Sequence, residues 1–168
     1  MAPLSVLDDH LLVAFEFDDL VRYHGRASIG GLALGFKVLE RGLELLADGP
    51  LDRRSVFVET AFDGPGTRDA FELVTRAVTG DRYRVVPDLA GSESLEAPQG
   101  HFVFRLSTAD AAATMHLRPG VVTDEFVELV RKHPRTAPEE AHLVSLKEAL
   151  AADIMGRRAD EVFDADDR

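Results

Sequence analysis

Residues 23–35 hold the side chains whose types and spacing are best suited to chemistry. The segment reads Tyr-His-Gly-Arg-Ala-Ser-Ile-Gly-Gly-Leu-Ala-Leu-Gly, so a histidine–glycine pair leads to a glycine doublet that opens a patterned helix. The first backbone amides of a helix have no intrahelical acceptor and can bind an anionic group. A histidine beside them can carry or move a proton near neutral pH. The segment therefore predicts a site for a small anionic or polar ligand.

Each polar residue of this segment has a candidate role in that site. His24 is the candidate general acid or base, and Arg26 is the candidate cation for a carboxylate or phosphate. Ser28 either caps the helix or contacts the ligand, and we favour capping over use as a nucleophile. A serine nucleophile needs a base and an oxyanion site, and the spacing from His24 to Ser28 indicates neither. The amides of Gly30 and Gly31 would stabilise negative charge.

Two acidic residues and two further histidines complete the candidates. Glu59 and Asp63 follow a predicted strand, where either carboxylate can orient His24 and raise its basicity, or simply be solvated. His101 and His116 stand at the ends of a predicted hairpin and are weak candidates, with His24, for a metal site completed by a carboxylate. Their spacing does not favour such a site, so we predict no metal and no other cofactor.

Charge and composition narrow the classes of partner. Nineteen basic residues against 30 acidic ones give a formal charge of −11, and 45% of the residues are hydrophobic, as in globular proteins. The backbone of a nucleic acid and an anionic membrane surface would both be repelled. The sequence has no cysteine, which excludes disulfides and thiolate ligands. Because it shows neither a signal-peptide pattern nor an apolar run of ~20 residues, we expect a cytoplasmic protein.

Hydrophobic periodicity predicts the helices that must position these residues. The strongest prediction is a helix over 31–47, because its leucines and Phe36 recur at spacings of three and four. The glycines at 31, 35 and 42 are better explained by close helix packing than by contact with a ligand. We expect such a helix to be covered on two sides. Further helices are predicted over 5–23, 67–78, 123–133 and 138–155.

Strands are predicted where short apolar or alternating runs are bounded by turn residues. These runs are 55–59, 83–86, and a hairpin of 101–106 with 111–117. Residues 89–100 read as a surface loop, and the acidic tail 164–168 reads as frayed. The order of elements predicts an α+β fold in one domain over 1–168, with a mostly antiparallel sheet of about four strands packed with helices.

The same motifs resemble those of the FmdE-like family, which takes its name from one of the components of formylmethanofuran dehydrogenase. His-Gly at 24–25 and Gly-Leu-Ala-Leu-Gly-Phe at 31–36 are similar to the family's His-Gly-His-x-Cys-Pro-Gly-Leu-Ala-Leu-Gly followed by an aromatic residue. Weaker similarities continue in the same order to about residue 164, including Gly-His-Phe-Val-Phe at 100–104 and Glu-Val-Phe at 161–163. The resemblance implies the α+β fold of that family.

The family's metal ligands do not carry over to this chain. Arg26 stands where the family has a second histidine, and either Ser28 or Ile29 stands at its cysteine, depending on where one inserted residue is counted. His24 alone matches a family ligand, and a single histidine does not hold zinc. The resemblance therefore implies a divergent member that has lost the thiolate metal site. Because family members are expected to pair, it also implies a homodimer.

These observations leave three interpretations of function. The first is a pocket for a small anionic or polar ligand at the loop of His24 and the following helix start, in a protein that is an enzyme if His24 acts as general acid or base. The second is a non-catalytic binding or assembly protein, in which the helix over 31–47 packs across a homodimer. The third is a metalloprotein with histidine and carboxylate ligands.

Overall fold

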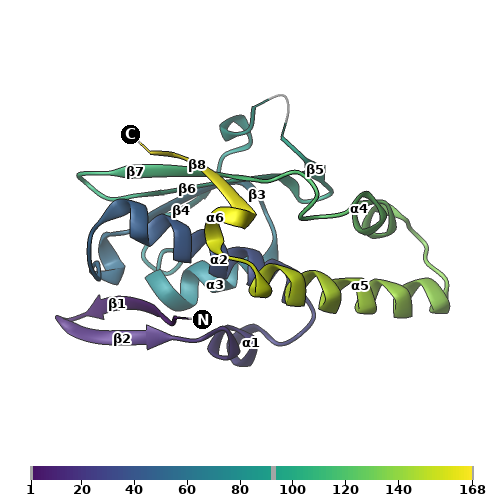
Figure 1. The fold of residues 1–168 in the computed structure, drawn as a ribbon, viewed down its shortest axis with the longest axis horizontal. Coiled ribbons are helices and arrows are strands. Elements are labelled where there is room, and N and C mark those ends of the chain that lie inside the picture. The colour runs from purple at the N-terminus through teal and green to yellow at the C-terminus, as the bar shows by residue number, and fades with distance from the viewer. Residues whose placement is uncertain (1, 92–93, 168) are drawn as a thin grey trace.

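The fold is built on a sheet of six strands whose inner face is covered by helices (Figure 1). The computed structural model describes residues 2–91 and 94–167. Residues 92–93, inside the predicted loop, and 168, in the predicted tail, lie outside the described residues. Along the sheet the strands are β4 (Tyr83–Val85), β3 (Phe57–Phe62), β6 (Gly100–Ser107), β7 (Ala112–Leu117) and β8 (Phe163–Asp167), and β5 (Glu96–Ala97) pairs with β6.

The sheet has more strands than predicted, and their orientation is mixed. β3 and β4 are parallel because the helix α3 (Pro65–Thr75) lies between them and returns the chain to the end where β3 began. The other neighbours are antiparallel, and the predicted hairpin of β6 and β7 is confirmed. The α+β class is therefore correct, whereas the predicted number of strands is too low. β5 lies in the segment predicted as a loop, and β8 lies in the predicted tail.

The central helix is α2 (Ile29–Leu46), which confirms the strongest prediction. It lies between the sheet and a second layer formed by α3 and the N-terminal segment (Figure 1). β6, β7 and β8 contact one side of it, and α3 and α5 (Ala137–Gly156) contact others. Its apolar residues, which the sequence suggested for a subunit interface, are thus buried within one chain. Further helices are α4 (Asp124–Arg131), α6 (Ala159–Val162) and the short η1 (Arg53–Ser55) and η2 (Pro87–Leu89).

The helix predicted over 5–23 is wrong, because its first part is a hairpin. β1 (Leu4–Asp8) pairs antiparallel with β2 (Leu11–Phe15), and only then does α1 (Phe17–His24) begin. Asp9 and His10 form the turn with φ of 48° and 67°, the left-handed region that aspartate adopts more readily than most residues. The apolar residues of this segment fit a period of two as well as a helical period, and Leu4 and Val6 alternate into the core.

The predicted frayed tail is also wrong, because residues 163–167 form β8 at the edge of the sheet. Phe163 is buried against the ring of Phe104, at a centroid distance of 5.8 Å. Asp164 pairs with Arg118 at 2.7 Å, and a second carboxylate of the strand reaches a histidine of β7. The strand is ordered because alternation sends Phe163 inward and the carboxylates of Asp164 and Asp166 toward basic partners.

Two predicted elements are shifted at their ends. β3 begins and ends two to three residues later than the predicted strand over 55–59. α3 begins at Pro65 with Gly64 as its N-cap, whereas the sequence suggested a start at Thr67. α4 and α5 follow their predictions, and their N-cap threonines accept hydrogen bonds from amides three residues on. Within the described residues, no helix combines the length and the apolarity that a membrane crossing needs.

Candidate functional site

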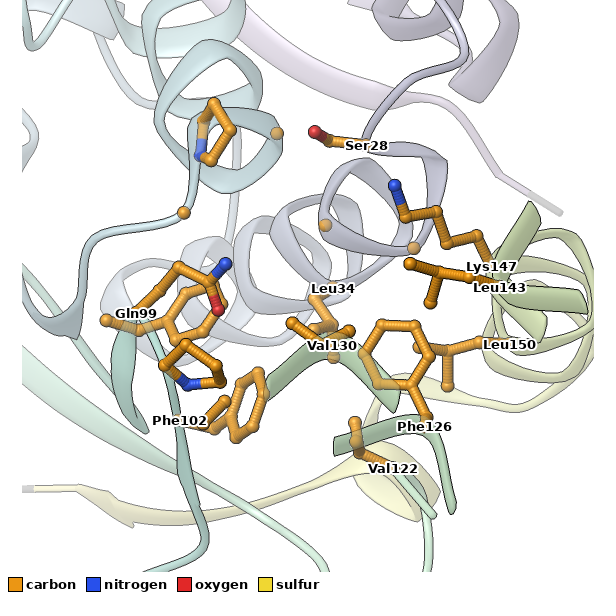
Figure 2. A pocket seen from close by; sticks show the side chains of 18 of the residues that line it. Ser28, Leu34, Gln99, Phe102, Val122, Phe126, Val130, Leu143, Lys147 and Leu150 are labelled. Atoms are coloured by element: carbon orange, nitrogen blue, oxygen red, sulfur yellow. The ribbon is translucent and has the colours of Figure 1, made fainter. Parts of the chain in front are cut away.

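A cavity of about 340 Å³ lies where α2 and α3 begin, between α4, α5 and the β5–β6 turn (Figure 2). This volume is near the lower end of the range for small-molecule sites. Its walls are mainly apolar and come from segments far apart in the sequence. Figure 2 shows these side chains converging on one space: Leu34, Phe102, Val122, Phe126, Val130, Leu143 and Leu150. Phe62 also lines the cavity.

Two helix N-termini line one end of this cavity. Ser28 is the N-cap of α2, and the glycines two and three residues after it, Gly30 and Gly31, line the cavity. Gly64 is the N-cap of α3, and Gly66 lines the cavity beside it. First-turn amides have no intrahelical acceptor, and in the described part of the chain no hydrogen bond uses those of these three first-turn glycines. These amides are therefore available to an acceptor from outside.

Glycine allows the two helix starts to touch. A Cβ atom built on Gly66 would lie 2.6 Å from the carbonyl oxygen of Ser28 and 2.9 Å from the amide nitrogen of Leu32. One built on Gly35, a turn further along α2, would lie 2.6 Å from the Cβ of Ala70 on α3. Packing between α2 and α3 thus explains Gly31 and Gly35, as the sequence suggested, whereas a Cβ on Gly42 would overlap Cδ1 of Leu106, so this glycine packs on the sheet and not on a helix. The contact of α2 with α3 also brings the positive ends of two helix dipoles together.

A few polar side chains complete the rim of the cavity. The Ser28 hydroxyl makes no capping hydrogen bond in the described structure, so the preferred capping role is not realised by its side chain. Lys147 on α5 donates from Nζ to the carbonyl oxygen of Ala27 at 2.9 Å. Gln99 points its amide into the cavity from the opposite wall (Figure 2). Arg135 also lines the cavity, but its guanidinium donates to carbonyl oxygens that end α4 and to Glu140.

His24 is the last residue of α1 and does not line the cavity. Its Nδ1 lies 2.7 Å from Oδ2 of Asp69, on the second turn of α3, with 11% of the histidine side chain and 28% of the aspartate side chain exposed. A carboxylate does orient the imidazole, but it is neither Glu59 nor Asp63. Sequence reasoning missed Asp69 because no local pattern shows that α1 packs on α3.

The other predicted ligands divide between the cavity and the surface. Ser28, Gly30 and Gly31 line it, as described above. Arg26 does not: its guanidinium forms two hydrogen bonds, of 3.1 and 2.6 Å, with Glu148 on α5, and the arginine side chain is 64% exposed. Together with Lys147 this pair holds α5 against the loop before α2.

Glu59 and Asp63 neither line the cavity nor pair with His24. Glu59 is paired with Arg105 across the sheet, with 3.9 Å between the charged atoms. Asp63 is exposed after β3, and its amide donates to the carbonyl oxygen of Gln99 at 2.8 Å. That bond ties the approach to α3 to the β5–β6 turn, so the position of Asp63 shapes the cavity without lining it.

The two further histidines each have a local partner. His101 lies 3.0 Å from the hydroxyl of Ser94, and His116 lies 3.2 Å from a carboxylate oxygen of Asp166. Within residues 2–91 and 94–167, no group of three or more histidine, aspartate or glutamate side chains is placed to hold a metal ion. The structure therefore does not bring the candidate ligands for a metal together.

Most of the cavity wall was not predicted as part of a site. Phe126, Val130, Leu143 and Leu150 belong to helices whose existence the sequence predicted, but their common partner depends on how α4 folds back on α5. One signal was available. Pro65 between two glycines fits the first position of a helix, where the missing amide is not needed, and this would have placed a second helix start here.

No model of a known protein family matches the chain, and no curated protein matches it.

Proposed function

We propose that the protein binds a small amphipathic anion in this cavity. The observation that carries the proposal is the contact of two helix starts at one end of a space that is otherwise apolar. The anionic group, a carboxylate or a phosphate, would accept from the free amides of Gly30, Gly31 and Gly66. The apolar body would lie against the side chains of α4 and α5.

The electrostatics of the helix starts support an anionic head group. Each helix N-terminus behaves as roughly half a positive charge and stabilises a nearby anion by about 0.3–1 kcal/mol, and by up to ~2 kcal/mol when partly buried. Here two such ends share one site, beside a wall of low polarity. The net charge of −11 repels anions in general, but salt screens that field beyond about 8 Å at physiological ionic strength. Local donors therefore decide which ligands are bound.

The size of the cavity limits the apolar body. A volume of about 340 Å³ corresponds to roughly ten non-hydrogen atoms if each takes the ~30 Å³ that water occupies in the liquid. A short acyl chain or a single aromatic ring fits this limit. Each buried methylene group contributes about 0.8 kcal/mol, so a chain of five methylenes contributes ~4 kcal/mol before the cost of association. We therefore expect modest affinity for such a simple probe.

Calorimetric titration with hexanoate, 1-hexanol and hexylamine tests the proposal, because these probes each have six carbon atoms and differ in the head group. Hexanoate should bind, and the amine should not. Leu143→Gln puts a polar amide into the wall and should weaken hexanoate binding by about tenfold or more. Val144→Gln, the next residue on α5, is the matched control because Val144 is exposed and outside the cavity.

Three results would overturn the proposal. Equal affinity for hexanoate and hexylamine would mean that the helix starts do not select an anion. No binding of any probe, with the fold of the protein intact by circular dichroism, would mean that the cavity is only a packing feature. Loss of binding in Val144→Gln as well as in Leu143→Gln would place the ligand elsewhere.

A second candidate function is general acid–base catalysis by His24, and the hydrogen bond to Asp69 favours it. An aspartate that accepts from Nδ1–H fixes the tautomer and leaves Nε2 free to take a proton. Nitrogen-15 NMR of the imidazole tests this arrangement directly. The neutral ring should carry its proton on Nδ1 in the parent protein and lose that preference in Asp69→Asn. A ring protonated on Nε2 in the parent would remove this candidate.

The FmdE-like resemblance is compatible with both candidates. We propose that the chain is a divergent relative in which the helix start of the His-Gly motif has kept its place and the metal ligands have been replaced. Arg26, at the position of the family's second histidine, contacts α5, and Ser28, one of the two candidates for the cysteine position, lines the cavity.

A further inference from the structure

We infer that two copies of this chain pair through the outer edge of β2 to form one continuous antiparallel sheet. β1 and β2 make a hairpin on the side of the molecule away from the six-stranded sheet (Figure 1). The far edge of β1 is occupied, because the amide of Leu7 donates to the carbonyl oxygen of Leu51 at 2.8 Å. In the described residues no strand or loop hydrogen-bonds to the far edge of β2.

The register of the hairpin shows which backbone groups face this free edge. Asp8 and Leu11 close the two-residue turn and form a hydrogen-bonded pair, and such pairs alternate along an antiparallel ladder. The groups of Leu11, Val13 and Phe15 therefore point to β1, and those of Leu12 and Ala14 point away. Leu7, opposite Leu12, donates away from β2, as this alternation requires.

The free backbone groups of β2 can pair with the same groups in a second copy of the chain. A two-fold axis through Val13 places Leu12 of one copy opposite Ala14 of the other, so that both residues of each copy exchange hydrogen bonds. A register centred on Leu12 or on Ala14 would use only one residue of each copy. The alternation thus selects one register for a second copy, and the resulting two-fold pair is the isologous type of interface that most homodimers use.

The side chains fit the same register. Leu11–Phe15 contains no ionisable residue and neither lysine nor proline, the residues that commonly protect an edge strand from pairing. Leu11 and Leu12 are 72% and 65% exposed, and in the paired sheet they lie opposite Phe15 and Ala14 of the second copy. The first ionisable residues beyond the strand, His10 and Glu16, come opposite each other. The register therefore avoids like charges in a chain that carries a net charge of −11.

Sedimentation velocity over a wide range of protein concentration tests the pairing. The parent protein should show a monomer–dimer equilibrium. Ala14→Pro removes an outward amide and no hydrogen bond to β1, so it should weaken the dimer at least tenfold and leave the hairpin in place. Leu12→Lys, which places a charge at the same edge, should do the same. Val144→Lys is the control because it adds that charge to another exposed apolar residue, on α5.

Amide hydrogen exchange supplies a second readout. In the dimer the amides of Leu12 and Ala14 should be protected, and dilution or Leu12→Lys should remove the protection of both while the amide of Val13 stays protected by β1. A parent protein that is monomeric at every concentration overturns the inference. So does a dimer that persists in both edge variants, or one that Val144→Lys abolishes while they leave it intact.

Discussion

A methyl group added to Gly66 should separate the two helix starts that form the polar end of the cavity. The new Cβ would lie 2.6 Å from the carbonyl oxygen of Ser28, 2.9 Å from the amide nitrogen of Leu32 and 3.0 Å from the carbonyl carbon of Gly31. All three atoms belong to the backbone, so no side-chain rotation can relieve the contact. The α2 and α3 helices must shift apart, and overpacking of this kind costs about 1–3 kcal/mol.

The cost can be measured as a change in the midpoint of thermal or urea unfolding. For a chain of this length each kcal/mol lowers the melting temperature by roughly 2–4 °C, so Gly66→Ala should melt about 2–12 °C below the parent. Gly49→Ala is the matched control, because a Cβ there meets nothing within 4 Å. It should be neutral or slightly stabilising, since alanine restricts the unfolded chain. A Gly66→Ala variant as stable as the parent would refute the close approach of the two helices.

Two further predictions concern ionisable groups. His24→Ala should lower stability by about 1.5–3 kcal/mol in urea, because it leaves Asp69 without its partner, yet it should leave hexanoate affinity within about twofold; loss of binding would instead place His24 in the site. Burial raises the pKa of Tyr83 from 10.0 to about 12, so the folded state holds this proton after the unfolded state has released it, and stability should fall as pH rises from 10.0 to about 12. Tyr83→Phe should remove that fall in stability. The variant should be no less stable than the parent at neutral pH, since the buried hydroxyl of Tyr83 has no partner in the described structure. An unchanged pH dependence of melting in the variant would contradict this prediction.

The helices and strands that could be predicted are those whose pattern admits one interpretation. α2 has a long apolar stripe, and α4 and α5 have threonine caps followed by acidic first turns. In these three helices the residues of the segment itself determine the secondary structure more than the neighbouring elements do. The prediction of a helix over 5–23 failed because the leucines of this segment fit the period of a strand as well as that of a helix. The turn at Asp9 and His10 decides between the two. The prediction of a frayed tail failed because the order of β8 depends on its pairing with β7 and on Arg118, the residue after β7.

The residues of the candidate site also fall into a group that could be predicted and a group that could not. Ser28, Gly30 and Gly31 lie within four residues of one another, and what they supply, the N-cap position and the free amides after it, is a local property of a helix start. They were therefore predictable. Asp69 and the apolar wall are not, because each depends on which helices pack together. The sequence does not show where a carboxylate points. Glu59, which pairs with Arg105 across the sheet, was therefore as good a candidate for the partner of His24 as Asp69.

The contact between α2 and α3 should link the stability of the folded protein to ligand binding. The Gly66→Ala variant allows this link to be measured. Two positive helix ends in contact repel each other, and the repulsion is relieved only when an anion lies between them. A bound carboxylate should therefore stabilise the folded protein by the binding energy and by the repulsion it cancels, which together appear in its measured affinity. In Gly66→Ala the ends lie further apart, so both terms shrink. Hexanoate should raise the melting temperature of the parent more than that of Gly66→Ala, even though the variant is the less stable protein.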